Sequence, residues 1–176
     1  MQESIQVGIA NSTAIAFSVG QANQFLTLVS LILAIAFTIY KFIKYEKKND
    51  KLRNVDLKYF NLDEFDSPDD NGSGNNMELG FLLKLDKCRE LAEIPFKINS
   101  GYRTPSHNKK IGGVKNSSHM NIPCNAVDIL AITSSERFKI IDAAIKVGIK
   151  RIGIGKNFIH LDTDENKSQN IIWHYY

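Results

Sequence analysis

The feature that most constrains this chain is an apolar run of 19 residues near its N-terminus, FLTLVSLILAIAFTIYKFI at positions 25–43. A helix needs about 20 apolar residues to cross the roughly 30 Å hydrocarbon core of a bilayer. The run just reaches that length, and Lys41 can extend its long side chain toward the membrane surface. The run therefore predicts a single transmembrane helix.

Two other interpretations of the run are less consistent with its flanks and length. A cleavable signal peptide has a basic start, a shorter apolar run and a small-residue cleavage site. Here the start carries Glu3, and the run leads into the basic string KFIKYEKK. A buried core helix is usually shorter. We therefore expect an uncleaved anchor, preceded by an N-terminal lead (1–24) and followed by a basic linker (44–56).

Charge around the anchor predicts its orientation. No Lys or Arg precedes the run, whereas six lie at its end or just after it: Lys41, Lys44, Lys47, Lys48, Lys51 and Arg53. Positive residues favour the cytoplasmic side of a membrane. The N-terminus is therefore expected outside and the C-terminal part in the cytoplasm.

The rest of the chain, residues 57–176, is long enough for one compact domain. The net charge of the whole chain is only +3, and the sequence shows no basic face interleaved with aromatic residues. We therefore expect no nucleic-acid partner. The two cysteines, Cys88 and Cys124, are either free thiols or one disulfide. There is no glycine-rich phosphate loop and no G-x-S-x-G motif, which removes the usual signs of nucleotide binding and serine hydrolysis. The oligomeric state is open.

The pattern of apolar residues predicts an α+β fold with a small, mainly antiparallel sheet and flanking helices. A helix over 77–94 presents Leu79, Leu82, Leu83, Leu85 and Leu91 at helical spacing, and a second helix begins at the T-x-x-E capping box of Thr133 and runs to about Val147. That helix directs Ile140, Ile141, Ala144 and Ile145 inward. Strands are expected in 95–103, 125–132, 151–155, 157–162 and 171–176.

Residues 97–129 carry polar groups that suit a metal site. His119 and Asp128 offer an imidazole and a carboxylate, and His160 can supply a third donor from a distant strand. Three protein donors with one open position are typical of catalytic zinc. Asp128 lies in the apolar strand 125–132, where an unpaired carboxylate is costly, so we expect a metal or a cation to meet it. Asp162 follows His160 by two residues, on the same face of a strand.

Several ordered motifs in residues 60–176 together resemble one family. They are SGYRTPSHN (100–108), GG (112–113), SSH (117–119), AVDI (126–129), GIG (153–155), FIHLD (158–162) and a terminal W-x-Y (173–175). The string is similar to the zinc D-alanyl-D-alanine carboxypeptidase family, which also includes phage endolysin peptidases. The resemblance implies a hedgehog or D,D-peptidase-like zinc fold, and it does not cover the membrane segment.

The resemblance also implies a ligand set and a reaction. One zinc ion is expected on His119, Asp128 and His160, with Arg103 contacting the substrate or stabilising the transition state. Tyr102, Ser117 and Trp173 are the expected substrate-binding residues. The implied reaction is hydrolysis of an amide bond in peptidoglycan stem peptides by zinc-activated water.

The sequence departs from the family pattern in two places. The first histidine and the aspartate are usually seven residues apart, whereas His119 and Asp128 are nine apart. Many relatives carry an acidic general base three positions before the last histidine, where this chain has Asn157, and a neutral amide cannot accept a proton. We expect Asp162 to take that catalytic role, with Asp164 and His174 as the alternatives.

The leading hypothesis is a membrane-tethered zinc peptidase that acts on the cell wall, as a D,D-carboxypeptidase or an endolysin-type endopeptidase. Its partners are then a peptidoglycan stem peptide and, through the N-terminal helix, a lipid bilayer. The predicted cytoplasmic domain lies on the wrong side of the membrane for that substrate, a conflict that a phage product solves by delayed release. The alternative is a non-catalytic zinc-stabilised module that binds wall peptides or a partner protein. A third hypothesis is a structural membrane protein that leaves Asp128 without a partner.

Overall fold

The computed structural model describes residues 20, 22–44 and 57–175 of the 176-residue chain. The chain divides into two compact units, Met1–Asp50 and Lys51–Tyr176, and each is described by itself. Most of the expected lead (1–24) and of the expected basic linker (44–56) lies outside the described residues. The structure therefore bears on the apolar helix and on the C-terminal domain.

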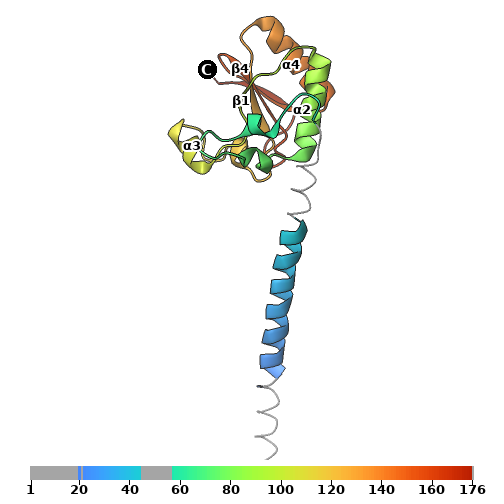
Figure 1. Cartoon of the computed structure of the whole chain (residues 1–176), viewed down its shortest axis with the longest axis vertical. Helices are drawn as coiled ribbons and strands as arrows, with labels where there is room; N and C mark the ends of the chain where they lie inside the picture. The colour runs from blue at the N-terminus through green and yellow to red at the C-terminus, as the bar shows by residue number, and fades with distance from the viewer. Residues whose placement is uncertain (1–19, 21, 45–56, 176) are drawn as a thin grey trace, which may run out of the picture. The chain divides into compact units, whose positions relative to one another are not determined.

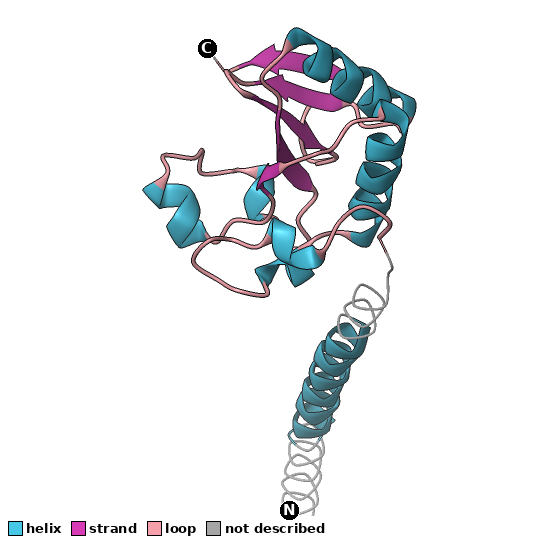
Figure 2. Cartoon of the chain, turned by 45° about the horizontal axis from the view of Figure 1, so that its top comes forward, coloured by secondary structure: helices cyan, strands magenta, loops and turns pink. Residues whose placement is uncertain are grey.

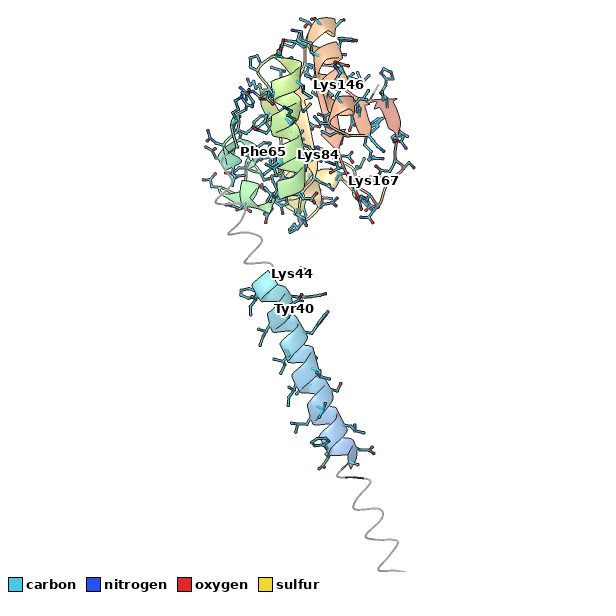
Figure 3. The ribbon with its side chains drawn as sticks, turned by 90° about the vertical axis from the view of Figure 1, so that its right-hand side faces the viewer. Tyr40, Lys44, Phe65, Lys84, Lys146 and Lys167 are labelled. Atoms are coloured by element: carbon cyan, nitrogen blue, oxygen red, sulfur yellow. The ribbon has the colours of Figure 1, made fainter. Side chains whose placement is uncertain are left out.

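The N-terminal unit contains one 23-residue helix, Ala22–Lys44. Its apolar side chains project outward around the helix, with Tyr40 and Lys44 near its C-terminal end (Figure 3). By length and composition the helix can cross a membrane, and it includes the whole predicted span 25–43. It is therefore a candidate membrane span.

The domain is built on a five-stranded sheet with the order β1-β2-β4-β3-β5. All neighbouring strands run antiparallel except β3 and β5, which are parallel. The strands are β1 (Ile98–Ser100), β2 (Ala126–Leu130), β3 (Arg151–Ile154), β4 (Phe158–Asp162) and β5 (Ile171–His174). The mixed, mainly antiparallel sheet agrees with the fold class expected from the sequence.

Helices α2 (Leu79–Ala92) and α4 (Ser134–Lys146) lie side by side and contact each other (Figures 1 and 2). The predicted capping box of α4 is present: the Thr133 hydroxyl accepts from the Glu136 backbone N–H, and the Glu136 carboxylate accepts from that of Thr133. The positive φ of Glu93 ends α2 just before Pro95.

The inward faces of both helices differ in part from the predicted ones. In α2 the buried residues are Phe81, Leu82, Leu85, Cys88 and Ala92, whereas Leu83 and Leu91 are exposed. In α4 the buried residues are Ile140, Ala143 and Ala144, and Ile145 is exposed. The spacing of the apolar residues allows more than one buried face for each helix. Packing in the core selects the face of α2 that carries Phe81 and the face of α4 that carries Ala143.

The other end of the domain is made of short helices and loops. Helix α3 (Pro105–Lys110) lies away from α2 and α4 (Figures 1 and 2), and three 3-10 helices are η1 (Leu62–Phe65), η2 (Ser73–Asn76) and η3 (Ser118–Met120). The core contains both cysteines, which are free thiols, so the disulfide alternative is wrong. We call the loop-rich part, residues 100–125, the loop half, and the five strands with α2 and α4 the sheet half.

Candidate metal centre

Two of the three expected metal ligands lie opposite each other on neighbouring strands. Strands β2 and β4 pair so that Asp128 stands beside His160. The Asp128 Oδ1 atom is 2.8 Å from the His160 Nδ1 atom. Both side chains are largely buried, so the sheet itself fixes a carboxylate and an imidazole at one point.

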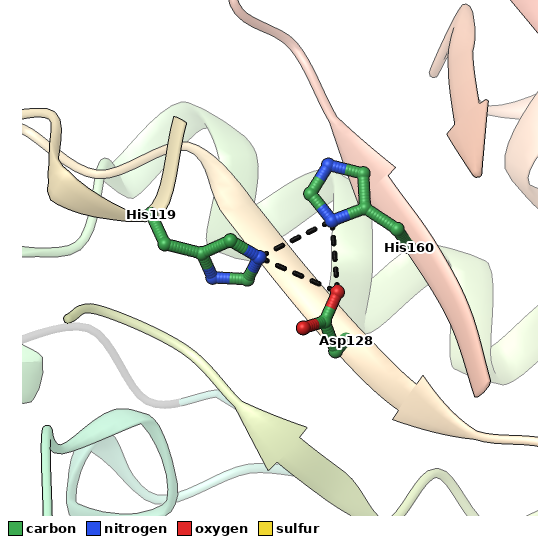
Figure 4. A group of neighbouring side chains, drawn as sticks. All are labelled: His119, Asp128 and His160. Carbon is green, nitrogen blue, oxygen red and sulfur yellow. Dashed lines mark hydrogen bonds and ion pairs between the residues drawn. The ribbon is translucent and has the colours of Figure 1, made fainter. Parts of the chain in front are cut away.

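The third ligand comes from the loop half. His119 lies in η3, whose first turn is capped by the Ser117 hydroxyl, which accepts from the His119 backbone N–H. The His119 Nε2 atom is 3.2 Å from His160 Nδ1 and 3.3 Å from Asp128 Oδ1 (Figure 4). All three donor atoms lie within 4.8 Å of one another, which is the arrangement needed around a single ion.

In each histidine, the ring nitrogen that faces away from the cluster has a hydrogen-bond acceptor, which leaves the other ring nitrogen to bind a metal. His119 Nδ1 is 2.6 Å from the Gly101 carbonyl oxygen, which can only accept, so this nitrogen carries the hydrogen. His160 Nε2 is 2.8 Å from the Asp162 Oδ2 atom and donates to it. With an ion bound, His119 Nε2 and His160 Nδ1 would present their lone pairs to it beside Asp128 Oδ1, whereas without an ion His160 Nδ1 donates to Asp128 Oδ1. Two neutral imidazoles and one carboxylate, each supported by an outer partner, fit a zinc site.

The two histidines have opposite pKa shifts although they face each other. Burial lowers the pKa of His119, which outweighs its attraction to Asp128. Burial also lowers the pKa of His160, but hydrogen bonds to Asp128 and Asp162 outweigh it and leave that pKa raised. Burial opposes ionisation of Asp128, yet the two histidines hold its pKa below the usual range. The carboxylate is thus present in its metal-binding form.

Arg103 is the cation that meets Asp128. Its Nη2 atom donates to Asp128 Oδ2, and its Nε atom donates to the Ser100 hydroxyl at 2.6 Å. Both members of the ion pair are almost fully enclosed, with side-chain exposures of 12% and 11%. The partner that the sequence predicted for a carboxylate in an apolar strand is therefore present in the protein itself.

Asp162 lies behind His160 and not in front of it. Its Oδ1 atom accepts from the Arg151 Nε atom at 2.7 Å and from the Asp164 backbone N–H at 3.0 Å, while Oδ2 accepts from His160. The residue is 1% exposed. Because both oxygens are engaged by buried partners, the geometry favours a role in orienting His160 over the general-base role expected from the sequence.

The other proposed substitutes for the base lie elsewhere. Asp164 accepts from Ser118 Oγ and Asn121 Nδ2 and does not line the metal cleft, and His174 is exposed on β5. Asn157 is exposed in the connection between β3 and β4, where its carbonyl oxygen accepts from the Ala131 N–H. It does not line the cleft either, so position 157 has no direct access to the metal cluster.

The cluster opens into a cleft of about 460 Å³. Of the expected substrate-binding residues, Ser117 and Trp173 line it. Tyr102 does not line it: the residue is 6% exposed and packs in the hydrophobic core. Its expected contact with the substrate stays a prediction.

Two apolar walls of the cleft were not foreseen as a pair. One is aromatic and contains Phe158, Trp173 and Tyr175, and the other contains Ile111 and Val114. The aromatic wall depends on Gly153, because a Cβ atom there would lie 2.6 Å from the Tyr175 ring and 2.8 Å from the Trp173 ring. The GIG motif was the available signal, since a glycine within a strand often marks a close approach.

The segment between His119 and Asp128, two residues longer than the family pattern, is tied to the start of α2. The Cys124 backbone N–H donates to the Asn76 carbonyl oxygen, and the Glu78 N–H donates to the Cys124 carbonyl oxygen, both at 2.7 Å. The longer spacing therefore forms an anchored excursion toward the start of α2 and leaves the two ligand side chains together.

Comparison with known proteins agrees with this geometry. Residues 58–162 match the model of the family described as Peptidase M15, a segment that contains all three members of the metal cluster and more than half of the chain. No curated protein matches the chain significantly. The resemblance to the zinc D-alanyl-D-alanine carboxypeptidase type is thus confirmed at the level of the family, and this chain belongs to the Peptidase M15 family.

Proposed function

We propose that the protein is a zinc-dependent peptidase that hydrolyses amide bonds in peptidoglycan stem peptides, as a D,D-carboxypeptidase or an endolysin-type endopeptidase. The observation that carries the proposal is the convergence of His119 Nε2, Asp128 Oδ1 and His160 Nδ1 on one point in a cleft. Membership of a peptidase family supports the reaction class. Zinc held there would polarise the scissile carbonyl and activate water.

The charges and surfaces of the cleft support a peptide that carries carboxylates. Three cationic side chains line it, Arg103, Arg151 and Lys167, against the carboxylates of Asp128 and Asp162. A divalent ion adds further positive charge, which favours an anionic substrate. Stem peptides combine carboxylates with small apolar side chains, which match the walls formed by Trp173 and Val114.

One observation favours a second candidate, a non-catalytic zinc-stabilised module that binds wall peptides or a partner protein. Among the described residues that line the cleft, the carboxylates are Asp128 and Asp162, and both are engaged by buried partners. A general base must reach the proton that it abstracts. If the protein is an enzyme, the proton released when zinc activates water would have to pass to solvent or to a group brought by the substrate.

Zinc loading and wall digestion separate the two candidates. The full-length protein in detergent, loaded with zinc, is incubated with purified peptidoglycan, and the released D-alanine and peptides are identified by mass spectrometry. The peptidase should release products that disappear with a chelator and with His119→Ala. Stoichiometric zinc binding without any cut stem peptide would support the binding module and reject the enzyme.

We further propose that Ala22–Lys44 anchors the domain in a membrane. The helix is long and apolar enough, and Lys41 and Lys44 at its C-terminal end favour the cytoplasm for the residues that follow. Access to a wall outside the membrane then requires release of the domain or a membrane lesion, as for an endolysin-type product of a phage. The orientation is tested with two C-terminal reporters, one active only in the cytoplasm and one active only outside. Activity of the cytoplasmic reporter would support the predicted orientation, and activity of the outside reporter would contradict it.

A further inference from the structure

The turn S-G-Y-R at residues 100–103 contacts two of the three members of the metal cluster. The Gly101 carbonyl oxygen accepts from His119 Nδ1, and the Arg103 guanidinium donates to Asp128. The Arg103 backbone N–H also donates to the His119 carbonyl oxygen at 2.9 Å. A single turn from outside the ligand-bearing strands and helix therefore holds one histidine and one carboxylate at the same time.

The two oxygens of Asp128 are divided between different partners. Oδ1 faces both histidines, at 2.8 Å from His160 Nδ1 and 3.3 Å from His119 Nε2. Oδ2 accepts from Arg103 Nη2. A carboxylate whose second oxygen is bound by a guanidinium offers a metal one oxygen and not two. Three single-atom donors leave the fourth tetrahedral position of zinc open.

Arg103 is itself held in place for this contact. Its Nε atom is committed to the Ser100 hydroxyl at 2.6 Å, and its side chain is only 12% exposed. The turn has no room to shift at Gly101, where a Cβ atom would lie 2.6 Å from the Phe65 Cα atom. The rigid guanidinium fork can contact Ser100 and Asp128 together, whereas a lysine ammonium is a single point of charge.

We propose that Arg103 is a positioning residue for the metal, which fixes Asp128 as a one-oxygen ligand. It does so through Asp128, a role separate from the contact with substrate or transition state that the family resemblance implies. The proposal rests on the zinc site of the proposed function and is independent of hydrolysis. It also gives the buried Asp128 a permanent counter-charge, and removal of one partner of a buried ion pair is costly.

The test measures metal binding in the full-length protein in detergent. Zinc affinity is determined by competition with a chromophoric chelator for the wild type, Arg103→Lys and Arg103→Met. Because outer partners of ligands typically contribute 10–100-fold to metal affinity, we expect zinc binding to weaken by about that factor in Arg103→Met and by less in Arg103→Lys. In the cobalt-substituted variants, the visible absorption spectrum should change to one typical of a higher coordination number, because Asp128 becomes free to bind with both oxygens.

A matched control is Arg137→Lys. The Arg137 side chain, on α4, donates to the backbone carbonyl oxygens of Ala131 and Lys156 and does not line the cleft, so zinc affinity and cobalt bands should not change. Circular dichroism and thermal unfolding confirm that each variant is folded, and Arg103→Lys provides the comparison if Arg103→Met unfolds.

The outcomes separate this proposal from the proposed function. Unchanged zinc affinity and cobalt bands in both Arg103 variants would overturn the positioning role. A fall in kcat without any change in zinc affinity would then indicate that Arg103 stabilises the transition state. Weaker zinc binding in the variants would support it even if the wild type cuts no wall peptide, a result that overturns the enzyme and leaves the positioning role. A wild type that binds no zinc would overturn both.

Discussion

The loop half and the sheet half hold the metal cluster by different means. Asp128 and His160 are placed by the backbone ladder between β2 and β4, in which they stand opposite each other. His119 stands on a 3-10 helix of three residues and depends on a ring hydrogen bond to Gly101 and on the Ser117 cap. Two ligands are therefore fixed by regular structure, and the third by the fit of one loop against another.

The outer partners differ in charge as well. His119 donates to a neutral backbone carbonyl, whereas His160 donates to the Asp162 carboxylate. Burial therefore dominates and lowers the pKa of His119, while the carboxylates raise that of His160. The difference teaches that similar imidazoles a few ångströms apart can be shifted in opposite directions by burial and by the carboxylates that each one meets.

The largest effect should come from removing a ligand from either half. His119→Ala and His160→Ala each leave two donors, so zinc affinity should fall by well over the roughly 100-fold effect of an outer partner, and wall hydrolysis should reach background. Competition with a chelator and peptide release provide the measurements. Full zinc affinity in His119→Ala would show that the loop half does not belong to the site.

The next effect is steric and acts on the loop half alone. In Gly101→Ala the new methyl group meets the Phe65 backbone at 2.6 Å, so we expect a loss of about 1–3 kcal/mol in the free energy of unfolding and weaker zinc binding. Urea unfolding measures the first. Gly80→Ala is the control, because its Cβ atom meets nothing closer than 3.9 Å in helix α2, where alanine is favoured over glycine.

A change in the sheet half should have a comparable effect on zinc affinity, and it should also lower stability because it breaks the buried ion pair between Arg151 and Asp162. Asp162→Asn removes the charged acceptor of His160 Nε2 and leaves the shape of the side chain nearly unchanged. We expect zinc affinity to fall about 10–100-fold. Asp142→Asn, at an exposed ion pair on α4, is the matched control and should leave zinc affinity unchanged.

The two thiols report on the two halves separately. Cys88 lies in α2 and Cys124 in the loop half, and burial raises the pKa of each to about 12. Neither thiol should react with iodoacetamide at pH 8 unless its region opens. We expect a chelator to accelerate alkylation of Cys124 more than that of Cys88, as mass spectrometry can follow. Equal acceleration would mean that the halves open together.

The smallest effect is expected at Asn157. Because this residue is exposed and lies outside the cleft lining, Asn157→Asp should leave kcat and zinc affinity unchanged. Steady-state kinetics on a stem peptide provide the measurement. A large gain in kcat would instead show that the connection between β3 and β4 reaches the substrate, and would restore the acid at this position as a general base.

The same contrast explains how much the sequence revealed. The strands and the capping box were predictable because alternation, Gly148 and the T-x-x-E motif are local signals. The grouping of His119, Asp128 and His160 followed from motifs whose order resembles that of a family, although the spacing of the first two differs. Both depend on residues close in sequence or on an order of motifs that resembles a known family.

What the sequence did not reveal depends on contacts between distant segments. The Arg151 contact with Asp162 joins two strands, and it favours an orienting role for Asp162 over the general-base role expected from the sequence. Tyr102 was expected to bind the substrate, yet its side chain packs in the core. Exposure of Leu83 and Ile145 likewise depends on which helix face meets the sheet.

Gly153 gives this fold a simple means of changing what it accepts. The glycine pairs with His160 on one side and with Trp173 on the other, so it lies in the sheet between a metal ligand and the aromatic wall. A side chain there would displace the rings of Trp173 and Tyr175, which also pack against His160. One methyl group at position 153 can therefore change the aromatic wall and the packing of a candidate metal ligand together.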